Sequence, residues 1–173
     1  MRRLRYNVAC SLDGFIAGPH GDYDWIVSDS SIDFNALFAQ FDTFILGRTT
    51  YEAVRSQGDQ NPLLGRQVIV ASRSLRQAEH PGVQVIGEHL TEAVSELKSR
   101  PGRDIWLFGG GNLARTLMDA RLVDTVEVAL MPVLLTRGVR IVPEGAALKL
   151  SLESAESLVS GIQMLRYSID YGA

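Results

Sequence analysis

Residues 104–117 read DIWLFGGGNLARTL, in which an apolar run passes into three glycines and then into a sequence typical of a helix. A helix that begins directly after a strand leaves its first backbone N–H groups unpaired, and these groups attract anions. Gly109, Gly111 and Ala114 also match the G-x-G-x-x-G/A pattern of dinucleotide-binding turns. A tight turn that needs a glycine at positive φ explains the same residues without a ligand. The segment therefore predicts a strand, a turn and a helix, with a phosphate site as the functional interpretation.

Apolar runs alternate with helical patterns on both sides of this segment. We expect strands at 5–10, 43–46, 67–72, 83–86, 104–108 and 125–131, and helices from about residue 31 and at 49–54, 91–99 and 112–120. Several early strands are continuous apolar runs, which is typical of a parallel sheet that is covered on both faces. Two long strands near 148–157 and 161–170 flank a Ser-Gly turn and predict an antiparallel hairpin at the sheet edge. The fold class is α/β with a mixed sheet.

The first predicted helix carries an aromatic stripe. Phe34, Leu37, Phe38 and Phe41 recur at i, i+3, i+4 and i+7, so we expect all four on one helical face against the sheet.

Length and composition exclude several function classes. The 173 residues show no linker and no repeat, which predicts a single domain over residues 1–173. A net charge of −3 argues against nucleic-acid binding, and no apolar stretch is long enough to span a membrane. The lone Cys10 and the absence of a signal-peptide pattern predict a cytoplasmic protein. Three scattered histidines are expected at the surface, with no metal site: His20, His80 and His89.

Two more predicted strands end in residues that suit a phosphate. Gly47 is followed by Arg48, Thr49 and Thr50, and the strand at 67–72 ends in Ser72 and Arg73. Parallel strands present their carboxyl ends at one sheet edge, so these residues should meet the glycine turn there. Arg48 as a solvated surface cation is the simpler alternative. Two arginines beyond a pyrophosphate cradle favour NADPH over NADH.

An ordinary Rossmann domain fits the sequence less well. Its glycines follow the first strand, whereas here they come late, and Glu127 falls inside a predicted strand, where it is as readily an outward-facing residue.

Taken in order, these segments resemble the dihydrofolate reductase superfamily, and more closely the reductase domain at the C-terminal end of bifunctional riboflavin-biosynthesis enzymes. The resemblance spans almost the whole chain. It rests on the closing hairpin and on SLDGFIAG at 11–18, ILGRTTYE at 45–52, VIVASRSL at 68–75 and the long segment 105–135. It implies a three-layer α/β/α dihydrofolate-reductase-like fold, NADPH as the hydride donor, and a homodimer.

The resemblance also implies contacts for the cofactor. Three small or apolar residues would line the nicotinamide pocket, the G-R-x-T segment and Ser72-Arg73 would bind the phosphates, and a cis Gly-Gly bond is usual in the glycine turn. The implied cofactor-binding residues are Ala9, Ile16, Ala17, Gly47, Arg48, Thr49, Thr50, Ser72, Arg73, Phe108, Gly109, Gly110, Gly111, Asn112 and Leu113.

The substrate side is less defined. Asp33 stands where related reductases carry an acidic residue early in the first helix, although it equally suits a helix start. Asp13 belongs to the SLDG motif and equally suits a turn, and Trp25 is either a wall of the substrate pocket or core. The chain departs from the family where Arg137 and Arg140 replace a glycine-rich segment.

The resulting functional expectation is an NADPH-dependent reductase, with Asp33 or Asp13 orienting the substrate or relaying a proton. The first expected substrate is a 5-amino-6-(5-phosphoribosylamino)uracil of riboflavin biosynthesis. Dihydrofolate, another small substrate, and a non-catalytic NADPH-binding role are the alternatives. The apolar segment 126–135, together with the hairpin that follows it, is the expected surface for a second copy.

Overall fold

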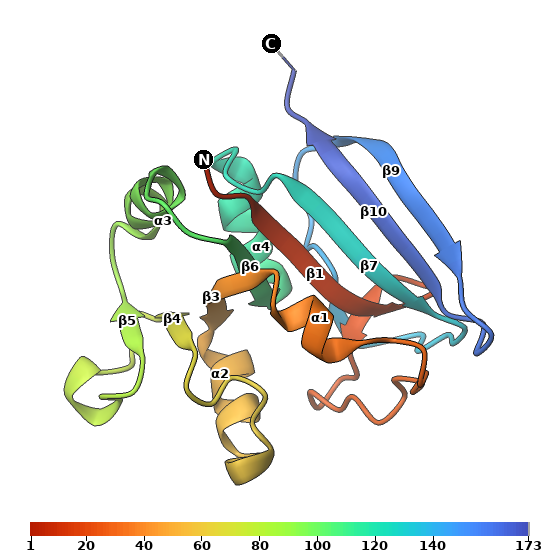
Figure 1. Cartoon of the computed structure of the whole chain (residues 1–173), viewed down its shortest axis with the longest axis horizontal. Helices are drawn as coiled ribbons and strands as arrows, with labels where there is room; N and C mark the ends of the chain where they lie inside the picture. The colour runs from red at the N-terminus through yellow and green to blue at the C-terminus, as the bar shows by residue number, and fades with distance from the viewer. Residues whose placement is uncertain (173) are drawn as a thin grey trace.

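The computed structural model of the chain describes residues 1–172 and is built on one eight-stranded sheet (Figure 1). The strand order is β5-β4-β3-β6-β1-β7-β10-β9, in which β10 runs antiparallel to both of its neighbours and all other pairs are parallel. This arrangement confirms a mostly parallel mixed sheet with an antiparallel hairpin at its edge. The strands are β1 (Leu4–Ser11), β3 (Phe41–Gly47), β4 (Gln67–Ala71), β5 (Gln84–Ile86), β6 (Asp104–Gly109), β7 (Thr125–Met131), β9 (Lys149–Ser157) and β10 (Gln163–Asp170).

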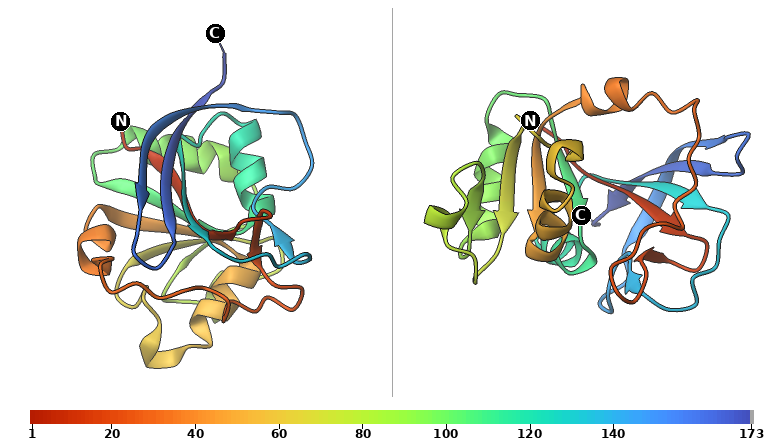
Figure 2. Two further views of the ribbon diagram at one scale, coloured as in Figure 1. Left: turned by 90° about the vertical axis from the view of Figure 1, so that its right-hand side faces the viewer. Right: turned by 90° about the horizontal axis from the view of Figure 1, so that it is seen from below.

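Helices cover both faces of this sheet. α1 (Phe34–Phe38) and α2 (Arg48–Arg55) lie on one face, and α3 (Leu90–Ser99) and α4 (Gly111–Asp119) lie on the other. The left view of Figure 2 shows α1 and α4 on opposite sides of the sheet. Two short 3₁₀ turns, at Gly58–Gln60 and Gln77–Glu79, complete the helical elements. The three-layer α/β/α arrangement expected from the resemblance is therefore confirmed.

The apolar strands supply a core on each face because neighbouring side chains of a strand point to opposite sides. In β6, Ile105 and Leu107 belong to the cluster under α3 and α4. Trp106 and Phe108 pack instead with the aromatic cluster under α1 and α2. Continuous apolar runs thus reflect burial on both faces.

The aromatic stripe predicted for the first helix is wrong in part. α1 ends at Phe38, and Phe41 is the first residue of β3, where only 2% of it is exposed. Phe38 packs against Trp106 with the ring centroids 5.0 Å apart, but Phe34 is 57% exposed. The chain turns after the helix, so one 3.6-residue period does not extend over all four positions.

Two short strands were not predicted. β2 (Phe15–Ala17) pairs with β8 (Val139–Arg140) as a separate two-stranded sheet. The pairing brings the segment after β1 against the segment after β7. It builds a second wall beside the carboxyl ends of the main sheet.

The segment expected to contact a second copy contains most of β7, and the hairpin that follows it forms one edge of the main sheet. β7 is flanked by β1 and β10, so its own edges are both paired. The main sheet ends at β5 on one side and at β9 on the other, and the residues of β9 are all exposed.

Candidate active site

A cavity of about 1860 Å³ lies at the carboxyl ends of the central parallel strands. Its wall includes Ala9 of β1, Gly47 of β3, Ala71 of β4 and Gly109 of β6. Sites for one small ligand usually enclose about 300–1,000 Å³. The volume therefore suits two ligands side by side, such as a dinucleotide and a substrate.

The glycine turn forms one end of this cavity. The peptide bond between Gly109 and Gly110 is cis, as the resemblance implies, and Gly109 has φ of 151°. Gly110 precedes α4 and offers no side chain to cap it, so the first N–H groups of the helix are left for a ligand. A Cβ on Gly111 would lie 2.4 Å from the carbonyl oxygen of Arg140, which leaves no room for a side chain.

The second strand end lies beside the first. Gly47 precedes α2 and also provides no side-chain cap. A Cβ on Gly109 would lie 3.2 Å from Oγ1 of Thr50, which brings the α2 start against the glycine turn. Arg48 is half exposed, and the nearest carboxylate, that of Glu52, is 3.8 Å away. Its charge is thus accessible from the cavity.

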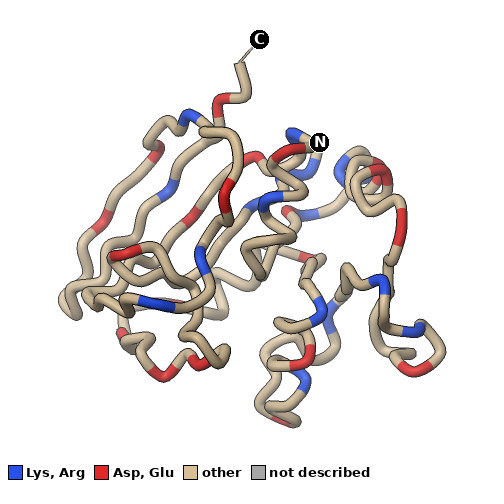
Figure 3. The backbone as a smooth tube through the Cα atoms, turned by 180° about the vertical axis from the view of Figure 1, so that it is seen from behind, with Lys and Arg blue, Asp and Glu red and all other residues tan. Residues whose placement is uncertain are grey.

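The end of β4 adds a second arginine to the cavity wall. Ser72 Oγ accepts a hydrogen bond from the backbone N–H of Leu75, which shapes the turn after β4. Arg73 follows in an exposed position on the cavity wall. Figure 3 shows acidic and basic positions interspersed along the backbone. Arg48 and Arg73 therefore place positive charge on this wall locally, rather than as part of a broad basic surface.

The structure brings every residue of the implied cofactor set onto this one cavity. The lining residues of that set are Ala9, Ile16, Ala17, Gly47, Arg48, Thr49, Thr50, Ser72, Arg73, Phe108, Gly109, Gly110, Gly111, Asn112 and Leu113. They come from both sheets and both uncapped helix starts, which are far apart in the sequence.

The other half of the cavity is mainly apolar, and sequence reasoning missed most of it. Its floor includes Ala129 and Met131 of β7 and Met164 of β10. The segment 20–32 and α1 line it as well. The alternating pattern of β7 and β10 was the available signal, but which face borders a cavity depends on the strand order.

Neither predicted catalytic carboxylate belongs to the cavity lining. Asp33 caps α1 and accepts a hydrogen bond from the N–H of Ala36 at 2.9 Å. Asp13 accepts from the N–H groups of Leu135 and Thr136, at 3.0 and 2.7 Å, and from the Ser11 hydroxyl. Desolvation opposes the shift, but these hydrogen bonds hold the pKa of Asp13 below its ordinary value. Both residues have structural roles, and their proton-relay role stays a prediction.

Trp25 also lies outside the lining residues. Its indole N–H donates to the carbonyl oxygen of Asp22, and its neighbours Tyr23 and Ile26 line the cavity instead. Asp29 anchors the same segment, because its carboxylate accepts from the N–H of Ser160 in the β9–β10 turn.

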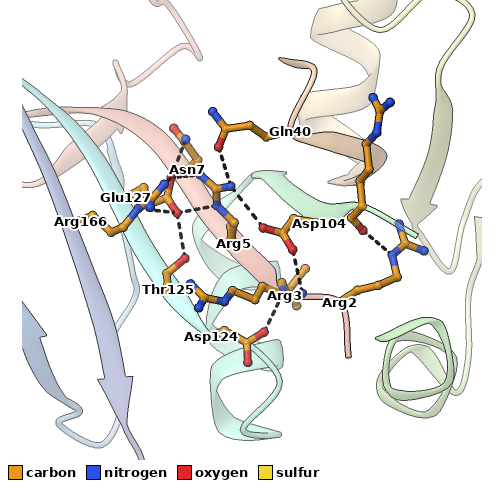
Figure 4. A network of polar contacts seen from close by, with 12 residues as sticks. Arg2, Arg3, Arg5, Asn7, Gln40, Asp104, Asp124, Thr125, Glu127 and Arg166 are labelled. Atoms are coloured by element: carbon orange, nitrogen blue, oxygen red, sulfur yellow. Dashed lines mark hydrogen bonds and ion pairs between the residues drawn. The ribbon is translucent and has the colours of Figure 1, made fainter. Parts of the chain in front are cut away.

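The expectation that Glu127 faces outward is wrong, because the residue is buried and only 7% of it is exposed. Arg5 donates to both of its carboxylate oxygens, at 2.6 and 2.7 Å. Thr125, Asn7 and Arg166 donate to it too (Figure 4). Burial alone would raise the pKa of Glu127, but the hydrogen bonds and charge of Arg5 lower it. Glu127 is therefore an ionised structural centre.

The histidine prediction is wrong for His80. This residue is buried, and its Nδ1 lies 3.1 Å from the hydroxyl of Tyr51. Among residues 1–172 no three His, Cys, Asp or Glu side chains gather in a way that could hold a metal ion. Within the same residues no helix has the length and apolar character needed to cross a membrane.

The sequence matches a known protein family over most of its length. Residues 2–164 match the family model of the RibD C-terminal domain. An uncharacterized Bacillus subtilis (strain 168) protein, YyaP, is 28% identical over 178 residues, which cover 96% of this chain and 94% of YyaP. The riboflavin biosynthesis protein RibD of Corynebacterium ammoniagenes is 25% identical over 77% of this chain, but that match spans 44% of RibD.

Solved structures support the same architecture. A protein from Shewanella sp. PV-4, named as a candidate riboflavin biosynthesis protein, has a TM-score of 0.83 at 24% identity, covering 98% of this chain and 99% of its own. A Thermotoga maritima diaminohydroxyphosphoribosylaminopyrimidine deaminase/5-amino-6-(5-phosphoribosylamino)uracil reductase has a TM-score of 0.69 at 13% identity, covering 98% of this chain and 57% of its own. At these identities the likeness establishes the fold.

Proposed function

Because the chain belongs to the RibD C-terminal domain family, we propose that it is an NADPH-dependent reductase of the riboflavin-biosynthesis type. The proposed substrate is a 5-amino-6-(5-phosphoribosylamino)uracil, whose ribosyl group would be reduced to ribityl. The observation that carries the proposal is the meeting of two uncapped helix starts and two accessible arginines on one cavity. The names of the C. ammoniagenes and T. maritima relatives support the reaction class.

The residues present fit the cofactor. The absence of a side chain at Gly47, Gly110 and Gly111 lets a pyrophosphate approach the N–H groups of α2 and α4. Arg48, Arg73 and Arg140 line the cavity, and the first two, which follow the carboxyl ends of β3 and β4, are the proposed partners of a 2′-phosphate, which accepts charge-assisted hydrogen bonds.

The chemistry is divided between cofactor and protein. NADPH supplies the hydride when it is bound. Ala9, Ile16 and Ala17 bound a pocket without bulky polar groups, which lets a flat ring pack closely. The apolar floor from β7 and β10 excludes water and aligns the acceptor carbon of the substrate with the cofactor.

A homodimer and a cytoplasmic location belong to the same proposal. β9 pairs with β10 on one side only and exposes Leu150 and Leu152, at 46% and 58%, and an open edge strand that exposes apolar side chains favours pairing with a second copy. Light scattering after size exclusion tests the state: Leu152→Glu should convert a dimer to a monomer. A wild-type monomer at all concentrations would refute the homodimer.

The cofactor assignment is tested by paired titrations. Arg48→Ala and Arg73→Ala should each weaken NADPH binding about 10-fold or more, since a charge-assisted hydrogen bond contributes about 1.5–3 kcal/mol. NADH binding should change little. Arg100→Ala, on an exposed arginine paired with Glu96, is the matched control and should alter neither affinity. An equal loss for NADPH and NADH would reject the 2′-phosphate contact.

The non-catalytic alternative is separated by turnover. NADPH oxidation at 340 nm with the phosphoribosylamino-uracil, and with dihydrofolate in parallel, decides between the substrates. Tight NADPH binding without oxidation by either substrate would favour a binding protein or a different substrate.

A further inference from the structure

Asn7 stands at the junction between the buried polar network and the cavity. It lies in the middle of β1, in register with Glu127 of β7, which in turn pairs with Arg166 of β10. The next layer toward the carboxyl end of β1 contains Ala9, paired with Ala129. Asn7 and Ala9 point to the same sheet face because they are two residues apart, and both line the cavity.

The network fixes which end of the Asn7 amide faces the cavity. Its Nδ2 donates to Oε2 of Glu127 at 3.1 Å (Figure 4). An ionised carboxylate only accepts hydrogen bonds, so the amide nitrogen must face Glu127 and the carbonyl oxygen Oδ1 must point away from it. The backbone is held as well, because the indole N–H of Trp106 donates to the carbonyl oxygen of Asn7 at 2.8 Å.

Glu127 is itself immobilised, which makes the orientation of Asn7 rigid. Arg5 donates to both carboxylate oxygens of Glu127. The third guanidinium nitrogen of Arg5 donates to Gln40 and Asp104. Arg5 and Glu127 are both buried, so their charges are neutralised within the network. Asn7 is the member of this network that also reaches the cavity wall.

The apolar surroundings of Asn7 Oδ1 let this oxygen discriminate between ligands. Ala9, Ala129 and Met164 form the apolar layer next to Asn7, with Trp106 and Phe108 also on the wall. Leaving a polar group unpaired in such surroundings costs binding energy. A ligand that fills this half of the cavity must therefore satisfy the acceptor.

We propose that Oδ1 of Asn7 is a specificity-determining acceptor that takes a hydrogen bond from a ring N–H of the substrate, held in place by Glu127 as a positioning residue. The inference rests on the proposed function and deepens it. The substrate class is a flat heterocycle with a lactam N–H in its ring, as in a uracil or a pterin. A ring that presents a lone pair or a negative charge at this point is rejected, because it would face the carbonyl oxygen.

The wild-type protein tests this without any substitution. With NADPH bound, the affinity for 6-(ribitylamino)uracil is compared with that for its two analogues in which C–H replaces one lactam N–H. One of the two analogues should bind about 10-fold more weakly, as expected for loss of one hydrogen bond to an acceptor that the bound ligand covers. Equal affinities for all three compounds would overturn the inference.

Asn7→Leu then assigns the effect to this residue. The variant should bind the uracil more weakly and lose the discrimination between N–H and C–H compounds, while NADPH affinity stays unchanged. A merely structural role would weaken all three compounds equally and keep their ratio, and that result would overturn the inference. Asn7→Ala, judged by the same ratio, replaces it should the leucine variant fail to fold.

The outcomes also separate the inference from the proposed function. If NADPH binds and none of the three compounds does, the Asn7 inference and the uracil substrate both fall, and the cofactor assignment stands. If NADPH does not bind either, the reductase assignment falls. If turnover of the phosphoribosylamino-uracil occurs without N–H discrimination, only the Asn7 inference is rejected.

Discussion

Glu127→Gln is the sharpest perturbation of the buried network. The substitution keeps the shape of the side chain but removes its charge, so Arg5 is left as a buried cation that faces an amide. The side chains of Arg5 and Glu127 are 6% and 9% exposed, and their shortest contact is 2.6 Å. Breaking such a pair by removing one partner costs about 3–5 kcal/mol. Asp104 stays 3.3 Å from Arg5 and is 29% exposed, which favours the lower end, about 3 kcal/mol.

Urea unfolding at pH 7 measures this cost, and the chain contains its own control. Arg100 and Glu96 also meet at 2.6 Å, but their side chains are 60% and 66% exposed. Glu96→Gln should therefore cost no more than about 0.5 kcal/mol. If both variants lose the same free energy of unfolding, burial does not govern the Arg5–Glu127 pair and the reasoning fails.

The pH dependence of the same variant carries a definite sign. The pKa of Glu127 is lowered in the folded protein, so its contribution is present above the unfolded value of about 4.3 and is lost as the pH falls through the folded value. The stability difference between wild type and Glu127→Gln should shrink below about pH 4. A difference that stays constant down to pH 2 would contradict the ionised state of Glu127.

Three further predictions concern single positions. Gly111→Ala should lower stability by about 1–3 kcal/mol and weaken NADPH binding, because the new Cβ meets the Arg140 carbonyl, whereas Gly82→Ala, with open space around it, should be nearly neutral in thermal unfolding. Asp33→Ala should lower the free energy of unfolding by about 1 kcal/mol, because the α1 cap is lost. A fall in kcat in protein that is still fully folded would instead support a proton-relay role. Burial raises the pKa of the Cys10 thiol to about 11, so the native protein should resist thiol reagents at pH 8, and rapid labelling would contradict its burial.

The part of the cavity lined by the glycine turn and the arginines was predictable because its sequence signals are local. Each phosphate-capable segment follows a continuous apolar strand, and parallel pairing of β3 with β4 and β6 brings Gly47, Ala71 and Gly109 to one edge. Because the carboxyl ends of parallel strands lie at one edge of a sheet, these three positions can be placed together from the sequence alone.

The rest depended on contacts that a sequence does not display. Arg5 and Glu127 are 122 residues apart, and they meet only because β1 and β7 are neighbours in one register. Phe41 satisfied a helical period although it begins a strand, since an aromatic residue near a boundary suits both elements. β2 and β8 are three and two residues long, too short for alternation to be recognised.

Titration of the purified protein with NADPH and NADH, followed by absorbance at 340 nm after addition of the phosphoribosylamino-uracil, tests the central claim most directly. The account predicts NADPH binding at least about 10-fold tighter than NADH binding, since one charge-assisted contact is worth that much, and oxidation of NADPH on addition of the uracil. Failure to bind either dinucleotide would contradict the assignment of the cavity to a cofactor.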